Sequence, residues 1–197
     1  MAAKDPTPDL PEGVEITHDH TGSTLRITGA RPVRALAHAA RQHVIELLYD
    51  GQVLTASAAA TAVGITPSAM SYHLRALEKF GIVRRADSLD GRERPWRAAA
   101  DHLAVTHSAL RQDDAGTETY LSALLPTVER ALRSASGIQV PTRFKRTTLQ
   151  LTPQEAEQLN TEVEALLDAW AARHATPSDG ARTYTQFWID APTGPDA

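Results

Sequence analysis

Residues 55–80 have the spacing of two short helices joined by a tight turn, and this spacing constrains the fold more than any other feature. Thr55 stands at an N-cap position before an alanine-rich stretch that ends at Gly64. Threonine caps helix N-termini, and glycine adopts the left-handed conformation of a helix C-terminus without strain. Thr66 and Pro67 mark a second start, because proline at the first helical position lacks only an N–H that has no helical partner. The sequence therefore predicts a helix-turn-helix unit.

The second helix divides into two faces at helical spacing. An apolar face is predicted to dock on the core, and its members are Met70, Leu74 and Leu77. The opposite face carries hydroxyl, phenol and cationic groups on Ser68, Ser71, Tyr72, Arg75 and Lys79. Such groups suit base edges and phosphates in a major groove. An ordinary solvated face has a similar composition, so the DNA interpretation depends on the segments that flank this helix.

A basic hairpin is predicted over residues 80–97, because Asp90-Gly91 is a strong turn signal between two short strand-like runs. Arg92 and Arg94 near its tip would reach a phosphate backbone or a minor groove. Trp96 is expected to anchor the hairpin to the body of the protein rather than to stack on a base. With a capped turn before the second helix and a basic hairpin after it, DNA binding is favoured over an ordinary solvated face.

The segments RALAHAARQHVIELLYDG and SAMSYHLRALEKFGIVRR resemble the winged-helix regulators of the ArsR-like (arsenic-repressor) superfamily, over residues 31–100. The resemblance implies a homodimeric transcription factor that reads a pseudo-palindromic operator with the helix at 66–80. It also implies that the wing touches flanking phosphates. Two departures stand out: residues 56–63 have alanines where such proteins usually place a leucine and a glutamate, which predicts thinner packing, and the chain lacks the cysteines that metal-sensing members generally use.

The candidate DNA-binding residues fall into two groups. Base readout in the major groove is assigned to Ser68, Ser71, Tyr72 and Arg75, and phosphate contacts are assigned to Thr55, Thr66, Arg92 and Arg94. The expected partner is a double-stranded DNA operator, bound by a homodimeric repressor. A protein-interaction module that uses the same face is the alternative from another class.

The charge distribution agrees with DNA binding. The chain has a formal net charge of −4, yet residues 31–100 hold ten lysines and arginines against six aspartates and glutamates, a net of +4. The remainder therefore carries −8. Positive charge gathers where the motif predicts phosphate contact, and the acidic remainder would repel DNA and help to orient the dimer.

Catalysis and metal binding find little support. The sequence has no glycine-rich phosphate loop, nucleophile elbow, HExxH motif or cysteine, so we expect no catalytic residue and no enzyme. Histidine could still bind zinc or nickel, but the single dense cluster is His18-Asp19-His20, and His102 and His107 do not share a helical face. We therefore expect no metal and no cofactor.

Three further histidines have expected structural roles. His38 and His43 are expected to pack or to bond a backbone carbonyl. His73 is expected to support the reading helix or to contact phosphate, and its protonation would tune DNA affinity.

The segments that flank the motif suggest three regions. Residues 1–30 form an arm with a disordered beginning and a short strand at 24–28, and residues 31–100 form the winged domain. Within that domain a helix is expected over 31–50, and Val53-Leu54 should form a minimal third strand beside the wing.

Residues 101–197 are expected to form a helical dimerisation segment and a small α/β extension. Residues 98–110 remain ambiguous between strand and helix, and Gln112 to Gly116 is expected to be a loop. A helix is predicted from Thr117 to Ser134, and Pro126 should kink or split it. This helix is either the dimer interface that the resemblance implies or a cover for the core of its own domain.

The last segment predicts a strand at 144–151, a helix from Thr152-Pro153 and a strand at 182–189. The fold class is therefore mainly α with small β (α+β), a winged helix-turn-helix domain with a strand-helix-strand extension. A small-molecule effector could bind in a pocket lined by Trp170, Tyr184 and Trp188 in the extension. No apolar run is long enough to span a membrane and no signal-type N-terminus is present, so a cytoplasmic location is expected.

Overall fold

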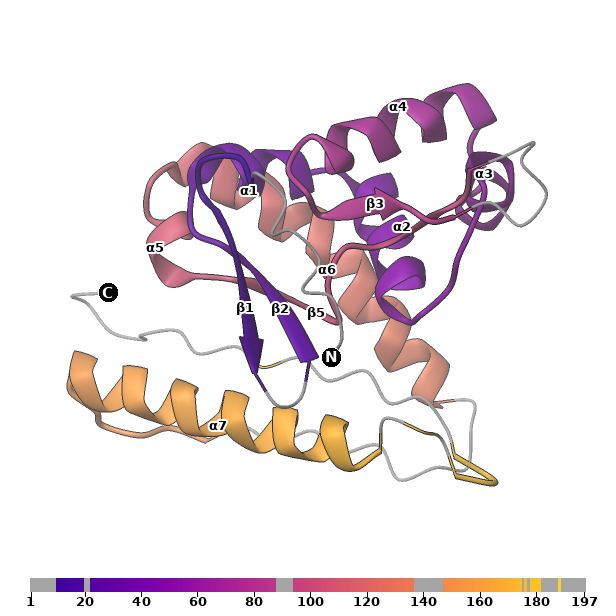
Figure 1. Cartoon of the computed structure of the whole chain (residues 1–197). Helices are drawn as coiled ribbons and strands as arrows, with labels where there is room; N and C mark the ends of the chain where they lie inside the picture. Colours follow the sequence, from indigo (N-terminus) through magenta and orange to yellow (C-terminus); the bar gives the residue numbers. More distant parts are fainter. Residues whose placement is uncertain are drawn as a thin grey trace. The chain divides into compact units, whose positions relative to one another are not determined.

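The computed structural model describes residues 10–19, 22–87, 94–136, 147–174, 176, 178–181 and 188. It divides into two compact units, Met1–Glu129 and Arg130–Ala197, and each is described by itself. The elements of the first unit include two small sheets and the helices α1 to α5 (Figure 1). This combination of helices and small sheets confirms the predicted fold class, mainly α with small β. The winged helix-turn-helix lies in the first unit.

The N-terminal arm forms a hairpin of β1 (Val14–Asp19) and β2 (Gly22–Ile27), with Val14 opposite Ile27. β5 (His102–Val105) pairs with β2 in parallel, which gives the strand order β1-β2-β5. The strand expected at 24–28 is confirmed, whereas β1 was not predicted. Val14 and Ile16 alternate with polar residues in β1, but this weak pattern acquires its meaning only from pairing with β2.

The ambiguity at residues 98–110 resolves into β5 followed by α5 (His107–Leu110). Thr106 separates the two elements, because its side chain accepts a hydrogen bond from the N–H of Ala109 and donates one to the carbonyl of Ile27. One threonine therefore caps α5 and ties it to β2.

The helix expected over residues 31–50 is two helices, α1 (Ala30–Leu36) and α2 (Ala39–Tyr49). His38 breaks them apart: its backbone is extended, and its Nδ1 accepts from the N–H of Ala40 at 3.1 Å, so the imidazole acts as the N-cap of α2. His38 packs on a neighbouring ring as expected, but the backbone group that it bonds is an N–H and not a carbonyl. The apolar period continues across the break, which concealed it in the sequence.

The helix-turn-helix is formed by α3 (Ala56–Val63) and α4 (Pro67–Glu78), which pack on each other, and α4 lies beside the wing strand β3 (Figure 1). Thr55 caps α3 by accepting from the N–H of Ala58 at 3.1 Å, and Thr66 caps α4 by accepting from that of Ala69 at 3.3 Å. Gly64 ends α3 with φ +79°, in the left-handed region that favours glycine. All of the predicted caps are confirmed.

The wing is an antiparallel pair of β3 (Val83–Arg85) and β4 (Trp96–Ala98). Leu54 forms an isolated antiparallel bridge with Trp96, so the pairing predicted beside the wing is confirmed for Leu54, whereas Val53 is in no strand. The predicted turn Asp90-Gly91 and Arg92 lie outside the described residues.

The core confirms the predicted docking face of α4. Met70, Leu74 and Leu77 have no exposed surface, and they cluster with the similarly buried Ile82 and Trp96. α3 fully buries only two alanines, Ala59 and Ala60. The expectation of thin packing at α3 is consistent with this arrangement, since alanine contributes little apolar area.

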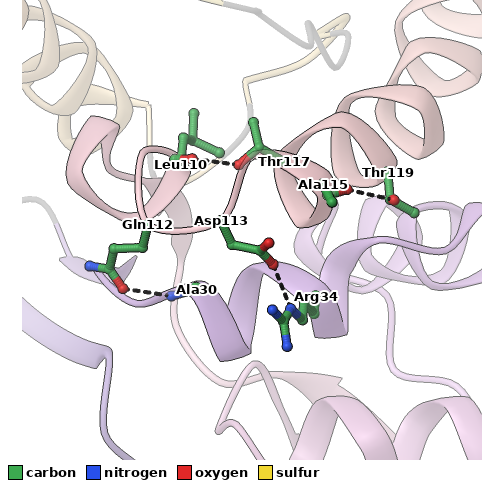
Figure 2. A network of polar contacts seen from close by, with 8 residues as sticks. All are labelled: Ala30, Arg34, Leu110, Gln112, Asp113, Ala115, Thr117 and Thr119. Atoms are coloured by element: carbon green, nitrogen blue, oxygen red, sulfur yellow. Dashed lines mark hydrogen bonds and ion pairs between the residues drawn. The ribbon is translucent and has the colours of Figure 1, made fainter.

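A polar network joins α1 to the turn between α5 and α6 (Asp114–Ser136), as Figure 2 shows. The Gln112 side chain accepts from the N–H of Ala30 and donates to the carbonyl of Thr28, both at 3.0 Å. Asp113 binds the guanidinium of Arg34, and this partner lowers the carboxyl pKa, as does a hydrogen bond from the backbone of Gly116. The expected loop over 112–116 is therefore shorter, because Asp113 caps the first turn of α6.

Pro126 lies inside α6 and does not split it, so of the two expected effects the split was wrong. The missing N–H of Pro126 leaves the carbonyl of Ser122 without its helical donor. Both residues are exposed to solvent. Water can bond that carbonyl, and the helix continues past the proline.

The second unit contains α7 (Pro153–Arg173), which starts with a capping box. Glu155 accepts from the N–H of Thr152 at 2.8 Å, while Thr152 accepts from that of Glu155 at 3.3 Å. Residues 147–151 are not a strand, which corrects the described part of the strand predicted at 144–151. Of the strand predicted at 182–189, only Trp188 is described, and it is not in a strand. Where the chain is described, no helix is long and apolar enough to cross a membrane.

We expect Leu74→Ala to lower the free energy of unfolding by about 2–5 kcal/mol, because it deletes a fully buried side chain and leaves a cavity. Tyr72→Ala on the same helix removes a side chain that is 63% exposed and should change this free energy by less than about 0.5 kcal/mol. Urea unfolding followed by circular dichroism measures both. Equal losses for the two variants would contradict the placement of α4.

Candidate nucleic-acid interface

The outer face of α4 presents most of the predicted base-reading residues to solvent. Ser68 and Arg75 are exposed, Tyr72 is 63% exposed, and Ser71 is half-buried beside them. Their spacing places them within two turns of one helix face. The predicted face is thus brought together, and none of its four residues is buried.

Arg75 extends along its own helix, because its Nε donates to the carbonyl of Ser71 at 3.1 Å. Its terminal nitrogens have no partner among the described residues. Guanidinium can donate two hydrogen bonds to O6 and N7 of guanine, the commonest specific contact in a major groove. The geometry therefore leaves Arg75 free for a planar acceptor pair.

The hydroxyls of Thr55 and Thr66 are acceptors in the two helix caps. A hydroxyl also has one O–H to donate, so each side chain can cap its helix and still bond a phosphate oxygen. Helix N-termini in addition carry partial positive charge, which favours an anion. These two threonines, which are among the four residues assigned to phosphates, therefore retain the capacity for that contact.

The wing divides its arginines between structure and solvent. Trp96 is 1% exposed, which confirms that it anchors the hairpin, and the guanidinium of Arg85 lies 3.7 Å from the centre of its ring. Arg85 also donates to the backbone carbonyl of Arg94 at 2.7 Å, whereas the Arg94 side chain is exposed. Arg85 is thus held by the wing itself, and Arg94 is available to a phosphate.

A pair of arginines that the sequence did not single out lies on the other face of the wing. Arg84 and Arg97 are directly opposite each other across β3 and β4. Both line a cavity of about 320 Å³ that also includes Asp101 and Ser23. Like charges at opposed positions destabilise a sheet, so this pair suits an anion placed between them. The register that opposes them could not be read from the sequence.

Asp101 is held at the edge of this cavity. Its Oδ2 accepts from the backbone N–H and from the hydroxyl of Ser23, both at 2.8 Å. Partial burial opposes ionisation, but the hydrogen bonds from Ser23, together with the charges of His102 and Arg97, outweigh it and lower the Asp101 pKa. The carboxylate is therefore charged at neutral pH and limits the cavity to ligands that tolerate a nearby negative group.

On the inner side of α4, His73 is 9% exposed, and its ring lies 4.4 Å from that of His38, centre to centre. Arg41 Nε donates to His73 Nδ1 at 3.4 Å. Of the two roles expected for His73, these contacts favour support of the reading helix over phosphate contact.

Two further kinds of site were considered in the sequence, a metal site that was not expected and an effector pocket in the extension. Among the described residues, no group of three or more histidines, cysteines, aspartates or glutamates could hold a metal ion. Trp170 and Trp188, expected to line a pocket in the extension, are more than half exposed, and Tyr184 lies outside the described residues. The cavity at Arg84 and Arg97 is formed by other elements.

Comparison with known proteins agrees with the local structure. Among solved structures, the chain is similar to a double mutant of ZitR from Lactococcus lactis in apo form, at 15% identity and a TM-score of 0.32, over 68% of this chain and 83% of ZitR. It is also similar to MepR, a transcription regulator of the Staphylococcus aureus multidrug efflux pump MepA, at 18% identity and a TM-score of 0.29, over 66% and 78%. Likenesses at this level carry no argument about fold or function. No curated protein sequence matches the chain. Residues 36–86 match the model of a family described as helix-turn-helix domain, and this match supports a DNA-binding helix-turn-helix regulator.

Proposed function

We propose that the chain is a sequence-specific DNA-binding transcription regulator, a homodimeric repressor of the ArsR-like type. The observation that carries the proposal is the division of α4, whose fully buried spine of Met70, Leu74 and Leu77 leaves Tyr72 and Arg75 exposed on the opposite side. A helix held in this way presents a rigid polar edge. Rigid, pre-positioned groups lose little entropy on entering a groove.

Base reading and phosphate binding belong to different elements in this proposal. Ser68, Ser71, Tyr72 and Arg75 on α4 face base edges, while Thr55, Thr66, Arg92 and Arg94 hold the backbone. Specificity is then lost by changes on α4, and affinity for every sequence is lost by changes on the wing. The net charge of +4 over residues 31–100 supports phosphate attraction.

The homodimer is supported by two faces of α6. Tyr120, Ala123 and Thr127 are buried, so one side of the helix covers the core of its own domain. Leu121, Leu125 and Leu132 are 46%, 65% and 51% exposed on the same helix. The two roles expected for this helix are therefore compatible, because each uses a different side of it.

DNA recognition is tested by selection of duplexes from genomic fragments, followed by footprinting. A symmetric dimer should protect two half-sites separated by one helical turn or a multiple. On the selected duplex, Arg75→Ala should lose about 1–3 kcal/mol of binding free energy at one base position and relax specificity there. Arg94→Ala should weaken all sequences alike and reduce the slope of affinity against salt. A uniform loss for both variants would refute the division.

The dimer has its own test. Introducing both Leu121→Glu and Leu125→Glu should convert a dimer into a monomer, because burying two carboxylates in an apolar interface is costly. Sedimentation equilibrium measures the mass, and Leu166→Glu, at an exposed leucine of α7, is the matched control. A monomeric wild-type protein, or an unaffected variant, would exclude this face as the interface.

The cavity at the wing favours a second candidate function, regulation by a small anionic effector. Arg84 and Arg97 would bind a carboxylate or phosphate group, and occupancy would act on both wing strands. An effector at 100 times its Kd should raise the free energy of unfolding by about 2.7 kcal/mol. Thermal unfolding with a panel of small phosphates and carboxylates would detect this. The shift should vanish in Arg84→Ala and persist in Arg111→Ala, and a panel without any shift would reject the candidate.

A further inference from the structure

We propose that His38, Arg41 and His73, called here the imidazole cluster, are positioning residues that hold α4 in its reading position only while both imidazoles are neutral. In its consequence for DNA, this inference rests on the proposed function. In its consequence for the folded domain, it stands on the geometry alone.

The cluster joins the reading helix to the junction between α1 and α2. Arg41 Nε donates to His73 Nδ1 at 3.4 Å, and its Nη1 donates to the carbonyl of Ala35 at 2.8 Å. One guanidinium thus connects the last turn of α1 with the middle of α4. The ring of His38, which caps α2, lies 4.4 Å from that of His73.

Both imidazoles must be unprotonated at Nδ1. An arginine Nε–H and a backbone N–H can only donate, so the His73 and His38 nitrogens that they meet must each offer a lone pair. A protonated imidazole has two N–H donors and no acceptor. Protonation of His73 therefore removes the contact with Arg41, and protonation of His38 removes the cap of α2.

The charges that surround the cluster make protonation more costly. Burial lowers the His73 pKa, and the like charges of His38 and Arg41 lower it further. On α4 itself, the exposed Tyr72 lies next to the His73 ring, and Arg75 and Glu78 are exposed further along the helix. α3 contains no titratable side chain. Of the charged side chains on the other elements packed against α4, Arg34 of α1 binds Asp113 and Arg85 of β3 stacks on Trp96. The same elements also carry Arg31 on α1, His43 and Glu46 on α2, and Arg84 on β3.

A lowered pKa fixes the direction of the pH effect. Below about pH 6.5, the ordinary histidine pKa, the unfolded or released state binds the proton more readily than the docked state does. The stabilisation from neutral His73 is fully present above the ordinary histidine pKa, and it is lost as the pH falls from there through the lowered pKa of His73. The carboxylates of Asp101 and Asp113, whose pKa values are also lowered, lose their contribution only below about pH 4 and leave this window clear.

The pH dependence of duplex affinity distinguishes this positioning role from a direct contact between histidine and phosphate. A histidine that contacts phosphate gains charge on acidification, so its duplex affinity increases. The imidazole cluster predicts that duplex affinity falls on acidification, because protonation removes contacts that hold α4 in position. The sign of the pH dependence therefore decides between the two.

The experiment compares the full chain with a variant that carries His38→Ser and His73→Gln. Serine keeps a cap acceptor for α2 and the glutamine carbonyl can still accept from Arg41, but neither titrates. Affinity for the selected duplex should fall roughly threefold to tenfold from pH 7.5 to 5.5 in the wild-type protein, and this fall should be absent from the double variant. His18→Gln, at an exposed histidine of β1, should behave as the wild type.

Two measurements need no DNA and keep the inference distinguishable from the proposed function. The wild-type melting temperature should drop between pH 7.5 and 5.5 by roughly 3 °C more than that of the double variant. The His73 ring should titrate below 6.5 in an NMR experiment on the wild-type chain, which also decides the matter if the variant fails to fold. A His73 titration at or above 6.5, an affinity that rises on acidification, or a fall retained by the folded variant would overturn the inference.

Discussion

The burial of one side of α4 is the constraint on which the rest of the structure depends. Met70, Leu74 and Leu77 are fully excluded from water, and they pack in the same cluster as Trp96 of the wing. Helical periodicity then leaves no freedom for the remaining positions, so Tyr72 and Arg75 must face outward. The packing that stabilises the domain therefore also aims the candidate reading face, and the two properties cannot be changed independently.

The features that could be predicted are those specified by a few neighbouring residues. Thr55, Gly64 and Thr66 act through bonds or dihedral angles within one helical turn, so local sequence was sufficient for them. The break at His38 was missed because imidazole is an uncommon cap and the apolar period runs through it. β1 was missed for a different reason: only Val14 and Ile16 carry its alternation, which is a weak pattern even though its partner β2 follows it directly in the chain.

The candidate site separates local from longer-range information. The face of α4 follows from a period of 3.6 residues, and the sequence placed its members on one side. The pairing of Arg84 with Arg97 depends instead on the register of the wing, and a shift of one residue would oppose different side chains. Opposed guanidiniums therefore became visible only when the strands were paired.

The composition of α3 explains why a polar cluster can influence α4 at all. In a helix-turn-helix, the second helix normally packs on large apolar side chains of the first. Here the fully buried residues of α3 are only Ala59 and Ala60. Each alanine buries a single methyl group, worth about 0.8 kcal/mol. With so little stabilisation from that side, the connection through Arg41 from the α1–α2 junction to His73 carries a larger share of the positioning. A connection that includes two imidazole rings is sensitive to pH in the range where histidine changes charge. Purely apolar packing of α4 would not respond to pH in that range.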